Sequence, residues 1–294
     1  MAAVAQPIGP DFKLKSILVA VDFAQLSKAI VRHAAALARI YSAELYLVHV
    51  VSPDQFNSFR GRSDALQDAW EKMHRTDQTL VDSGLMTDYP YYVVVREGDV
   101  WKQLRDVIER QEIELVLLGT RNQLNESPKN LGTIAEQVFR YANCSVLTFG
   151  QPAVPTPQRM KKLVFPTDLS GASLAALPYA IAIANHHLAQ LIIVRVPGSA
   201  GRNRKNFLEK VARILTTYVP EVKPEGYEFF ADPVNAILKI TEDSRASGII
   251  MSSDCSCRLV DSDDSWWSTT YEVMRKAACP VLSFRNPQPA LRVV

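Results

Sequence analysis

Two glycine-containing segments are the part of this sequence best suited to hold an anion. Gly119 ends an apolar run, and Gly132-Thr133 stands directly before an amphipathic stretch. A glycine and a hydroxyl at the start of a helix let a phosphate approach the first backbone N–H groups, at the positive end of the helix dipole. Arg121 could add positive charge. Taken alone, the pattern favours a plainer interpretation, a glycine turn followed by a threonine that caps a helix.

An acid at the end of another apolar run could complete such a site. Asp22 follows the run that begins at Ser16, and its carboxylate could accept hydrogen bonds from ribose hydroxyls. In an open parallel sheet, ligands bind beyond the carboxyl ends of the strands, where the strand order reverses. Asp22, Val50 and Gly119 each lie at or near the end of an apolar run. If those runs are parallel strands, the three residues belong to one edge of the sheet.

Short apolar runs alternate with amphipathic stretches through the first half of the chain. The runs predicted to be strands are Ser16–Asp22, Glu44–Val51, Tyr91–Val95, Leu115–Gly119 and Ser145–Phe149. The stretches predicted to be helical are 25–41, most of 54–84, the region around 100–108, and 134–141. This alternation predicts an α/β fold with a parallel sheet covered by helices. The nearly continuous apolar runs indicate burial on both faces.

The chain repeats this organisation. Lys15-Ser-Ile-Leu-Val-Ala-Val-Asp22 corresponds to Lys161-Lys-Leu-Val-Phe-Pro-Thr-Asp168, at an offset of 168 − 22 = 146 residues. The segments around Cys144 and Cys279 correspond at an offset of 279 − 144 = 135, so the second copy is about ten residues shorter. A period this long indicates a duplicated domain, because solenoid repeats span only about 20–50 residues. The proline-rich segment 151–160 predicts a stiff linker between domains 1–150 and 161–294.

At these residues the chain resembles the universal stress protein family, and its two halves together resemble a tandem member. ATP-binding members of that family carry Gly-x-x-Gly, nine residues, and then Gly-Ser/Thr after the fourth strand. Gly119-Thr-Arg-Asn122, nine residues and Gly132-Thr133 match this spacing, with Asn122 in place of the second glycine. Asn adopts left-handed backbone more readily than most residues, so the turn can survive the change. Val-Asp22-Phe and His49-Val50 also agree, and the resemblance covers about 14–150 and 160–286.

The resemblance implies two Rossmann-like, adenine-nucleotide-binding domains, each a five-stranded parallel sheet with helices on both faces, paired through their last strands as an internal pseudo-dimer. It implies a site for ATP, alone or with Mg²⁺, in the first half. Asp22 would contact ribose or adenine, Val50 would hold adenine through its backbone, and the glycine segments would line the phosphates. The residues implied to form the site are Ala20, Val21, Asp22, Val50, Gly119, Arg121, Asn122, Gly132, Thr133 and Ile134.

The second half departs further from the pattern. Ser252-Ser-Asp-Cys-Ser256 replaces the glycine turn, and Trp266-Trp267-Ser268 stands where the first half has Gly132-Thr133. An indole cannot give the close backbone approach of a glycine, and the three acids between 261 and 264 would repel phosphate. We therefore expect a degenerate site that does not bind a nucleoside triphosphate. The tryptophans would then fill the vacated pocket or cover the other half.

Composition limits the classes of function. The chain has 294 residues, 47% of them hydrophobic and 22% charged, with a formal net charge of +2. This balance argues against a nucleic-acid coat or a polybasic membrane anchor, and no apolar run is long enough to predict a membrane span. Four cysteines and an N-terminus unlike a signal peptide lead us to expect a cytoplasmic protein. Cys255-x-Cys257 offers at most half of a zinc site, and no other residues suggest a metal.

Three functions stay open at this point. The first is a stress-response regulatory module that binds ATP or a related nucleotide and associates with itself, within the chain and as a homodimer. The second is a slow ATPase or autophosphorylating enzyme, although no general base, nucleophile or metal cluster is evident near the strand ends beyond Asp22. The third is a scaffold that binds no nucleotide, which the replacement of a glycine by Asn122 keeps open.

Overall fold

The computed structural model separates into two compact units, which are described one at a time. The first spans Lys13–Pro157 and the second includes Gln158–Val294. The residues that the structure describes are 14–56, 61–84, 89–120, 131–150, 160–168, 171–196, 225–228, 232–252 and 265–285. The division between the units falls inside the predicted linker, whose residues 151–159 lie outside the described part of the chain.

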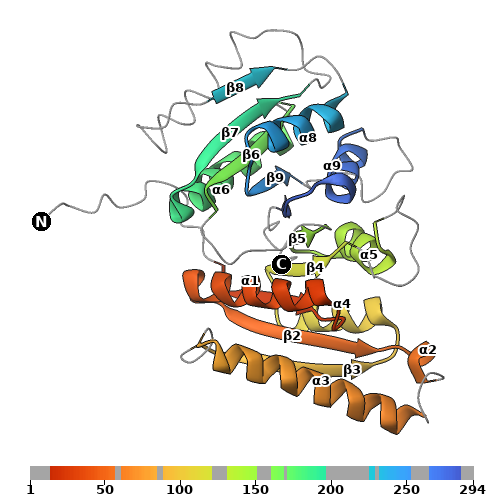
Figure 1. The fold of residues 1–294 in the computed structure, drawn as a ribbon. Helices are drawn as coiled ribbons and strands as arrows, with labels where there is room; N and C mark the ends of the chain where they lie inside the picture. The colour runs from red at the N-terminus through yellow and green to blue at the C-terminus, as the bar shows by residue number, and fades with distance from the viewer. Residues whose placement is uncertain are drawn as a thin grey trace, which may run out of the picture. The chain divides into compact units, whose positions relative to one another are not determined.

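The first unit is the predicted parallel five-stranded sheet. Its elements in chain order are β1 (Ser16–Ala20), α1 (Gln25–Tyr41), β2 (Glu44–Val51), α2 (Pro53–Phe56), α3 (Arg62–Asp82), β3 (Tyr91–Glu97), α4 (Val100–Arg110), β4 (Leu115–Gly119), α5 (Thr133–Tyr141) and β5 (Ser145–Phe149). The strand order is β3-β2-β1-β4-β5, and neighbouring strands are parallel (Figure 1). The order therefore reverses at β1, which lies between β2 and β4.

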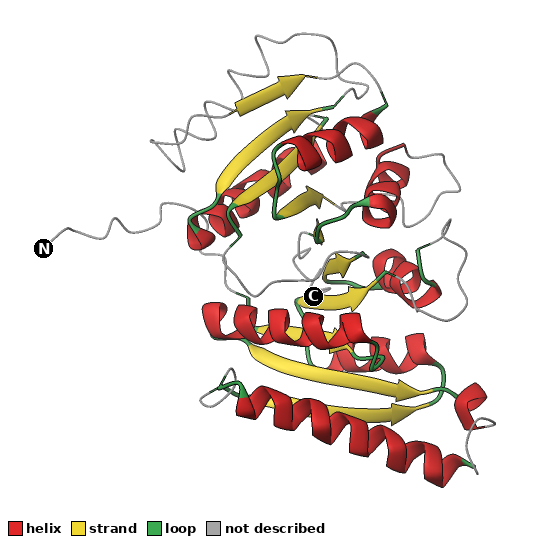
Figure 2. Ribbon diagram, in the orientation of Figure 1, coloured by secondary structure: helices red, strands yellow, loops and turns green. Residues whose placement is uncertain are grey.

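Helices cover both faces of this sheet (Figure 2). On one face, α1 packs on β1, β2 and β4 and touches α3, which packs on β2 and β3. On the other, α4 packs on β2 and β3 and touches α5. Strands β1, β4 and β5 are buried along nearly their whole length, which explains why their sequences are continuously apolar rather than alternating. The predicted apolar face of α1, with Ile30, Ala34, Leu37 and Ala38, is buried.

Three element boundaries differ from the sequence prediction. Strand β1 ends at Ala20. The N–H of Val21 makes the last backbone hydrogen bond to β2, to Val48 O at 2.8 Å, and the N–H of Asp22 donates instead to Ser27 Oγ at 3.3 Å. Strand β3 continues to Glu97, where its pairing with Val51 ends. Helix α5 begins at Thr133, one residue earlier than predicted.

The second unit has the same strand order. Its described elements are β6 (Lys162–Thr167), α6 (Gly171–His187), β7 (Gln190–Arg195), β8 (Glu225–Glu228), α8 (Pro233–Asp243), β9 (Gly248–Ser252), α9 (Ser265–Lys276) and β10 (Val281–Phe284). The order β10-β9-β6-β7-β8 is parallel throughout. Leu163 pairs with Leu191 as Ile17 pairs with Leu45, so the offset of 146 residues holds in the ladder itself. Pairing of the two units through their last strands stays a prediction.

Among the residues described, none of the helices has the length and apolar character needed to cross a bilayer.

Candidate functional site

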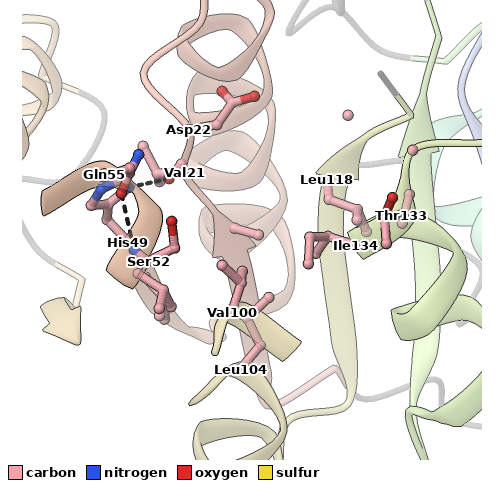
Figure 3. Close-up of a pocket in the computed structure, with 16 residues that line it drawn as sticks. Val21, Asp22, His49, Ser52, Gln55, Val100, Leu104, Leu118, Thr133 and Ile134 are labelled. Carbon is pink, nitrogen blue, oxygen red and sulfur yellow. Dashed lines mark hydrogen bonds between the residues drawn. The ribbon is translucent and has the colours of Figure 1, made fainter. Parts of the chain in front are cut away.

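An open pocket of about 280 Å³ lies at the carboxyl edge of the first unit's sheet. The ends of β1, β2 and β4 form it together with α4 and the first turn of α5 (Figure 3). Its lining residues are Ala20, Val21, Asp22, Val48, His49, Val50, Ser52, Gln55, Val100, Leu104, Leu118, Gly119, Gly132, Thr133, Ile134 and Ala135. The pocket therefore occupies the point where the strand order reverses, the usual place for a ligand in such a sheet.

The structure brings together most of the residues that the sequence singled out. Eight of the ten line this pocket: Ala20, Val21, Asp22, Val50, Gly119, Gly132, Thr133 and Ile134. The other two, Arg121 and Asn122, lie outside the described residues. The sequence prediction missed the other eight lining residues: Val48, His49, Ser52, Gln55, Val100, Leu104, Leu118 and Ala135. Val100 and Leu104 belong to a predicted apolar helical stripe, and their spacing of four residues could have placed both on the face of α4 that meets the sheet.

The turn after β1 holds the Asp22 carboxylate in a defined way. Asp22 Oδ1 accepts a hydrogen bond from the N–H of Ala24 at 3.0 Å. Asp22 Oδ2 has no hydrogen-bond partner among the described residues and can accept from a ligand hydroxyl. The next residue, Phe23, has φ of 62°, in the left-handed region that an aromatic residue rarely adopts. Such backbone strain persists only where the surrounding structure maintains it.

His49 supports this turn from the neighbouring strand. Its Nδ1 lies 2.7 Å from the carbonyl oxygen of Val21, and its ring packs against Phe23 with 4.3 Å between ring centroids. The imidazole is 7% exposed. Burial lowers the pKa of His49, which opposes the effects of the hydrogen bond to Val21 and of the nearby Asp22. The ring is therefore neutral near pH 7, and since a carbonyl can only accept, Nδ1 carries the proton and donates it.

The first turn of α5 faces the pocket without a capping side chain. Gly132 is the N-cap, with φ of −50° and ψ of 145°, and as a glycine it has no side chain that could cap the helix. Thr133 is the first helical residue, so the plainer interpretation of it as the capping residue is wrong. Any residue can adopt the backbone of Gly132, and Ser, Asn or Asp would cap better. The conformation does not require a glycine here, whereas close approach of a ligand to the helix would.

The charged groups around the pocket are few. Asp22 is the single acidic lining residue among those described, and no lysine or arginine is among them. Positive potential comes from the N-terminus of α5. Lys72, on α3, lies outside the lining, 5.7 Å from the centre of the Phe23 ring and 2.7 Å from Asp68. In the described part of the chain, no group of three or more His, Cys, Asp or Glu side chains is arranged to hold a metal.

The corresponding edge of the second unit is built differently. Asp168, at the position of Asp22, accepts a hydrogen bond from Ser173 Oγ at 2.8 Å. Ser173 Oγ also lies 2.8 Å from Thr167 Oγ1. The position of His49 is taken by Arg195, which is 7% exposed. The residues that replace the glycine turn, 253–264, lie outside the described part of the chain, as do the side chains of Trp266 and Trp267 in the first turn of α9.

Comparisons with known proteins agree with the sequence resemblance. The model of the universal stress protein family matches residues 13–149. Universal stress protein A of Salmonella typhi is 31% identical over 108 residues, which cover 36% of this chain and 74% of that protein. A universal stress protein of Methanocaldococcus jannaschii is 23% identical over 145 residues, which cover 47% of this chain and 83% of that protein.

A solved structure extends the likeness of fold to nearly the whole chain. The crystal structure of a universal stress protein from Archaeoglobus fulgidus covers 94% of this chain and 100% of its own, with a TM-score of 0.72 at 16% identity. At that identity the match shows a common fold. Together with the family model and the relatives at 31% identity, it confirms the resemblance seen in the motifs: this chain belongs to the universal stress protein family.

Proposed function

We propose that the protein is a stress-response regulatory module whose first half binds ATP, or a related adenine nucleotide, in the pocket beyond β1, β2 and β4. The observation that supports this most strongly is the convergence of Asp22, Gly119, Gly132 and Thr133 on one pocket at the reversal of strand order. These residues come from three separate segments: the turn after β1, the end of β4 and the start of α5. Each supplies a group that one part of a nucleotide requires.

The described residues fit such a ligand in three respects. The apolar side chains of Val48, Val50 and Leu118 offer walls for a planar base. The exposed oxygen of Asp22 can accept from ribose hydroxyls. The N-terminus of α5, where Gly132 has no side chain, lets phosphate oxygens approach the positive end of the helix dipole. Mg²⁺ would come with the phosphates, since it usually keeps several waters and takes few protein ligands.

We propose that the nucleotide acts as a regulatory ligand and is not turned over. Among the described residues, the titratable side chains that line the pocket are Asp22 and His49. One oxygen of Asp22 caps the turn and Nδ1 of His49 is held by Val21. A general base must lie within hydrogen-bond reach of the proton that it removes, and we assign these two groups to the turn and to the ribose rather than to the phosphates. If the protein releases more than one ADP per chain and the amount rises with time, the slow ATPase is favoured instead.

We also propose that the second half does not bind a triphosphate. In the second unit, Ser173 donates a hydrogen bond to the Asp168 carboxylate. In the first unit, the equivalent Ser27 accepts from the backbone N–H of Asp22, so the Asp22 carboxylate bonds to the turn and keeps one oxygen for a ligand. Trp266 and Trp267 occupy the first turn of α9, at the positions of Leu131 and Gly132. Bulky residues at the start of this helix argue against close approach of phosphate.

The direct test is to release nucleotide from freshly purified full-length protein with acid and identify it by chromatography. We expect about one ATP or ADP per chain. Gly132→Trp, which copies the second half into the first, should abolish it. Tyr141→Trp is the matched control, because it places the same side chain at the exposed far end of α5, where Tyr141 is 61% exposed. No released nucleotide and no thermal shift with added ATP and Mg²⁺ would overturn the proposal and favour the scaffold.

A further inference from the structure

Val21 is fixed to β2 on both sides of its peptide unit. Its N–H donates to Val48 O at 2.8 Å, which is the last backbone bond of this strand pair. Its carbonyl accepts from the side chain of His49 at 2.7 Å, where the sheet ladder has already ended. His49 therefore extends the hydrogen bonding of β1 to β2 by one step beyond the strand. The peptide that it fixes is the one that leads directly into Asp22.

The turn that follows needs such a fixed start. Between Asp22 and Ala24 the chain leaves the sheet, passes through the left-handed conformation of Phe23 and enters α1. The ring of Phe23 packs on the ring of His49, at 4.3 Å between centroids. One imidazole thus contacts the residues on both sides of Asp22. Rotation of the Val21 peptide or relaxation of Phe23 would move the Asp22 carboxylate away from its present place in the lining.

We propose that His49 is a positioning residue for the ribose end of the nucleotide: it holds the Val21 peptide and the Phe23 ring so that Asp22 meets the 2′- and 3′-hydroxyls of a ribonucleotide. This inference rests on the proposed nucleotide function and deepens it. It predicts a ligand chosen for its cis-diol, and therefore a site that discriminates against nucleotides lacking both hydroxyls. The second unit, where Arg195 replaces His49 and Ser173 holds Asp168, does not carry this arrangement.

The test compares ATP with 2′,3′-dideoxy-ATP on the full-length protein by isothermal titration. A hydrogen bond to a charged group is worth about tenfold or more in affinity, so the wild type should prefer ATP by about that factor. His49→Leu removes the donor at similar size. The ratio of the two affinities should fall to within about twofold of one, while the affinity for the dideoxy nucleotide stays within about twofold of wild type. A merely structural role would weaken both nucleotides equally.

Two further variants separate the two ring nitrogens. The amide of His49→Asn places a donor near the position of Nδ1, whereas His49→Gln places it near the position of Nε2. We expect Asn to keep most of the preference for ATP and Gln to lose it, and this pair decides the matter if His49→Leu does not fold. Equal preference in all variants and wild type would overturn the inference while leaving nucleotide binding intact. A wild type that binds neither nucleotide would refute the proposed function itself.

Discussion

The backbone N–H of Gly132 donates to the carbonyl oxygen of Thr120 at 2.6 Å. Thr120 is itself anchored, since its N–H donates to Phe149 O at 3.0 Å and its Oγ1 lies 3.3 Å from the same oxygen. The segment between these residues, which contains Arg121 and Asn122, thus begins and ends at one fixed place beside β5. The geometry of the α5 terminus is set by the fold before any ligand binds.

This arrangement predicts that Gly132→Ser separates stability from binding. The backbone of Gly132 accepts any residue, and serine is a good N-cap. We expect the free energy of unfolding to change by less than about 0.5 kcal/mol. The added side chain enters the space for phosphate, so ATP affinity should fall by about tenfold or more. Urea denaturation and isothermal titration measure the two quantities, and unchanged ATP affinity would show that no ligand approaches this glycine closely.

A second prediction uses the duplication as its own control. Asp22→Ala should reduce ATP affinity by about tenfold or more, because the ribose would lose a charged acceptor. Asp168→Ala, the same change in the second unit, should leave the affinity and the stoichiometry of one nucleotide unchanged, because Asp168 is bound to Ser173. Equal losses in both variants, or a stoichiometry of two, would contradict the assignment of the site to the first half.

The stability of α4, which lines the pocket, should depend on its N-cap residue. Asp99 accepts from the N–H of Lys102 at 2.8 Å, and α4 carries the lining residues Val100 and Leu104. Asp99→Ala should lower the free energy of unfolding of the first unit by about 1 kcal/mol. Asp232→Ala, which removes the equivalent cap from α8, should cost about the same in the second unit. Hydrogen exchange resolved by peptide can assign each loss, and a loss spread evenly over both units would be inconsistent with local capping.

His49 should make the free energy of unfolding depend on pH. Because burial lowers its pKa in the folded protein, the unfolded chain takes up this proton first as the pH falls below about 6.5. The free energy of unfolding should therefore decrease from about pH 6.5 down to the folded pKa of His49, below which this contribution is fully lost. Protonation at Nε2 would also place a charged ring beside Lys72.

The measurement is a series of urea denaturations between pH 5 and pH 8 on wild type and His49→Asn. The variant should show a flatter dependence over this window. Burial also lowers the pKa of His186, but that residue is present in both proteins, and its contribution cancels in the difference. A difference that stays constant with pH would mean that His49 does not titrate differently in the folded and unfolded states.

The fold could be predicted from the sequence because its strands are unusually uniform. The boundaries of α1, β2, β4 and β5 agree with the prediction, since the strands are mostly apolar and α1 carries a clear apolar face. The start of α4 also has a local explanation in the sequence. Asp99 is the cap of α4, and Gly98 before it has φ of 121°, which favours a glycine.

The candidate site was less predictable where it depends on side chains that also serve the core. His49 lies in an apolar strand, where its side chain type alone indicates no partner. Its bond to Val21 joins two strands whose pairing at that point cannot be predicted from either segment alone. Gln55 also lines the pocket, and its side chain accepts from the N–H of Ser52 at 3.0 Å. Such contacts follow from the tertiary arrangement rather than from a pattern of spacing.

The register of the two ladders records how the gene duplication has diverged. Corresponding pairs in β1–β2 and β6–β7 differ by 163 − 17 = 146 and 191 − 45 = 146 residues. In β1–β4, Leu18 pairs with Val116, and in β6–β9 the corresponding Val164 pairs with Ile249. The partners Val116 and Ile249 differ in number by only 249 − 116 = 133. The deletion thus fell in the connections between β7 and β9, and the strands kept their alignment. The two copies thus share one sheet register as a common scaffold, while the residues at its carboxyl edge differ between them.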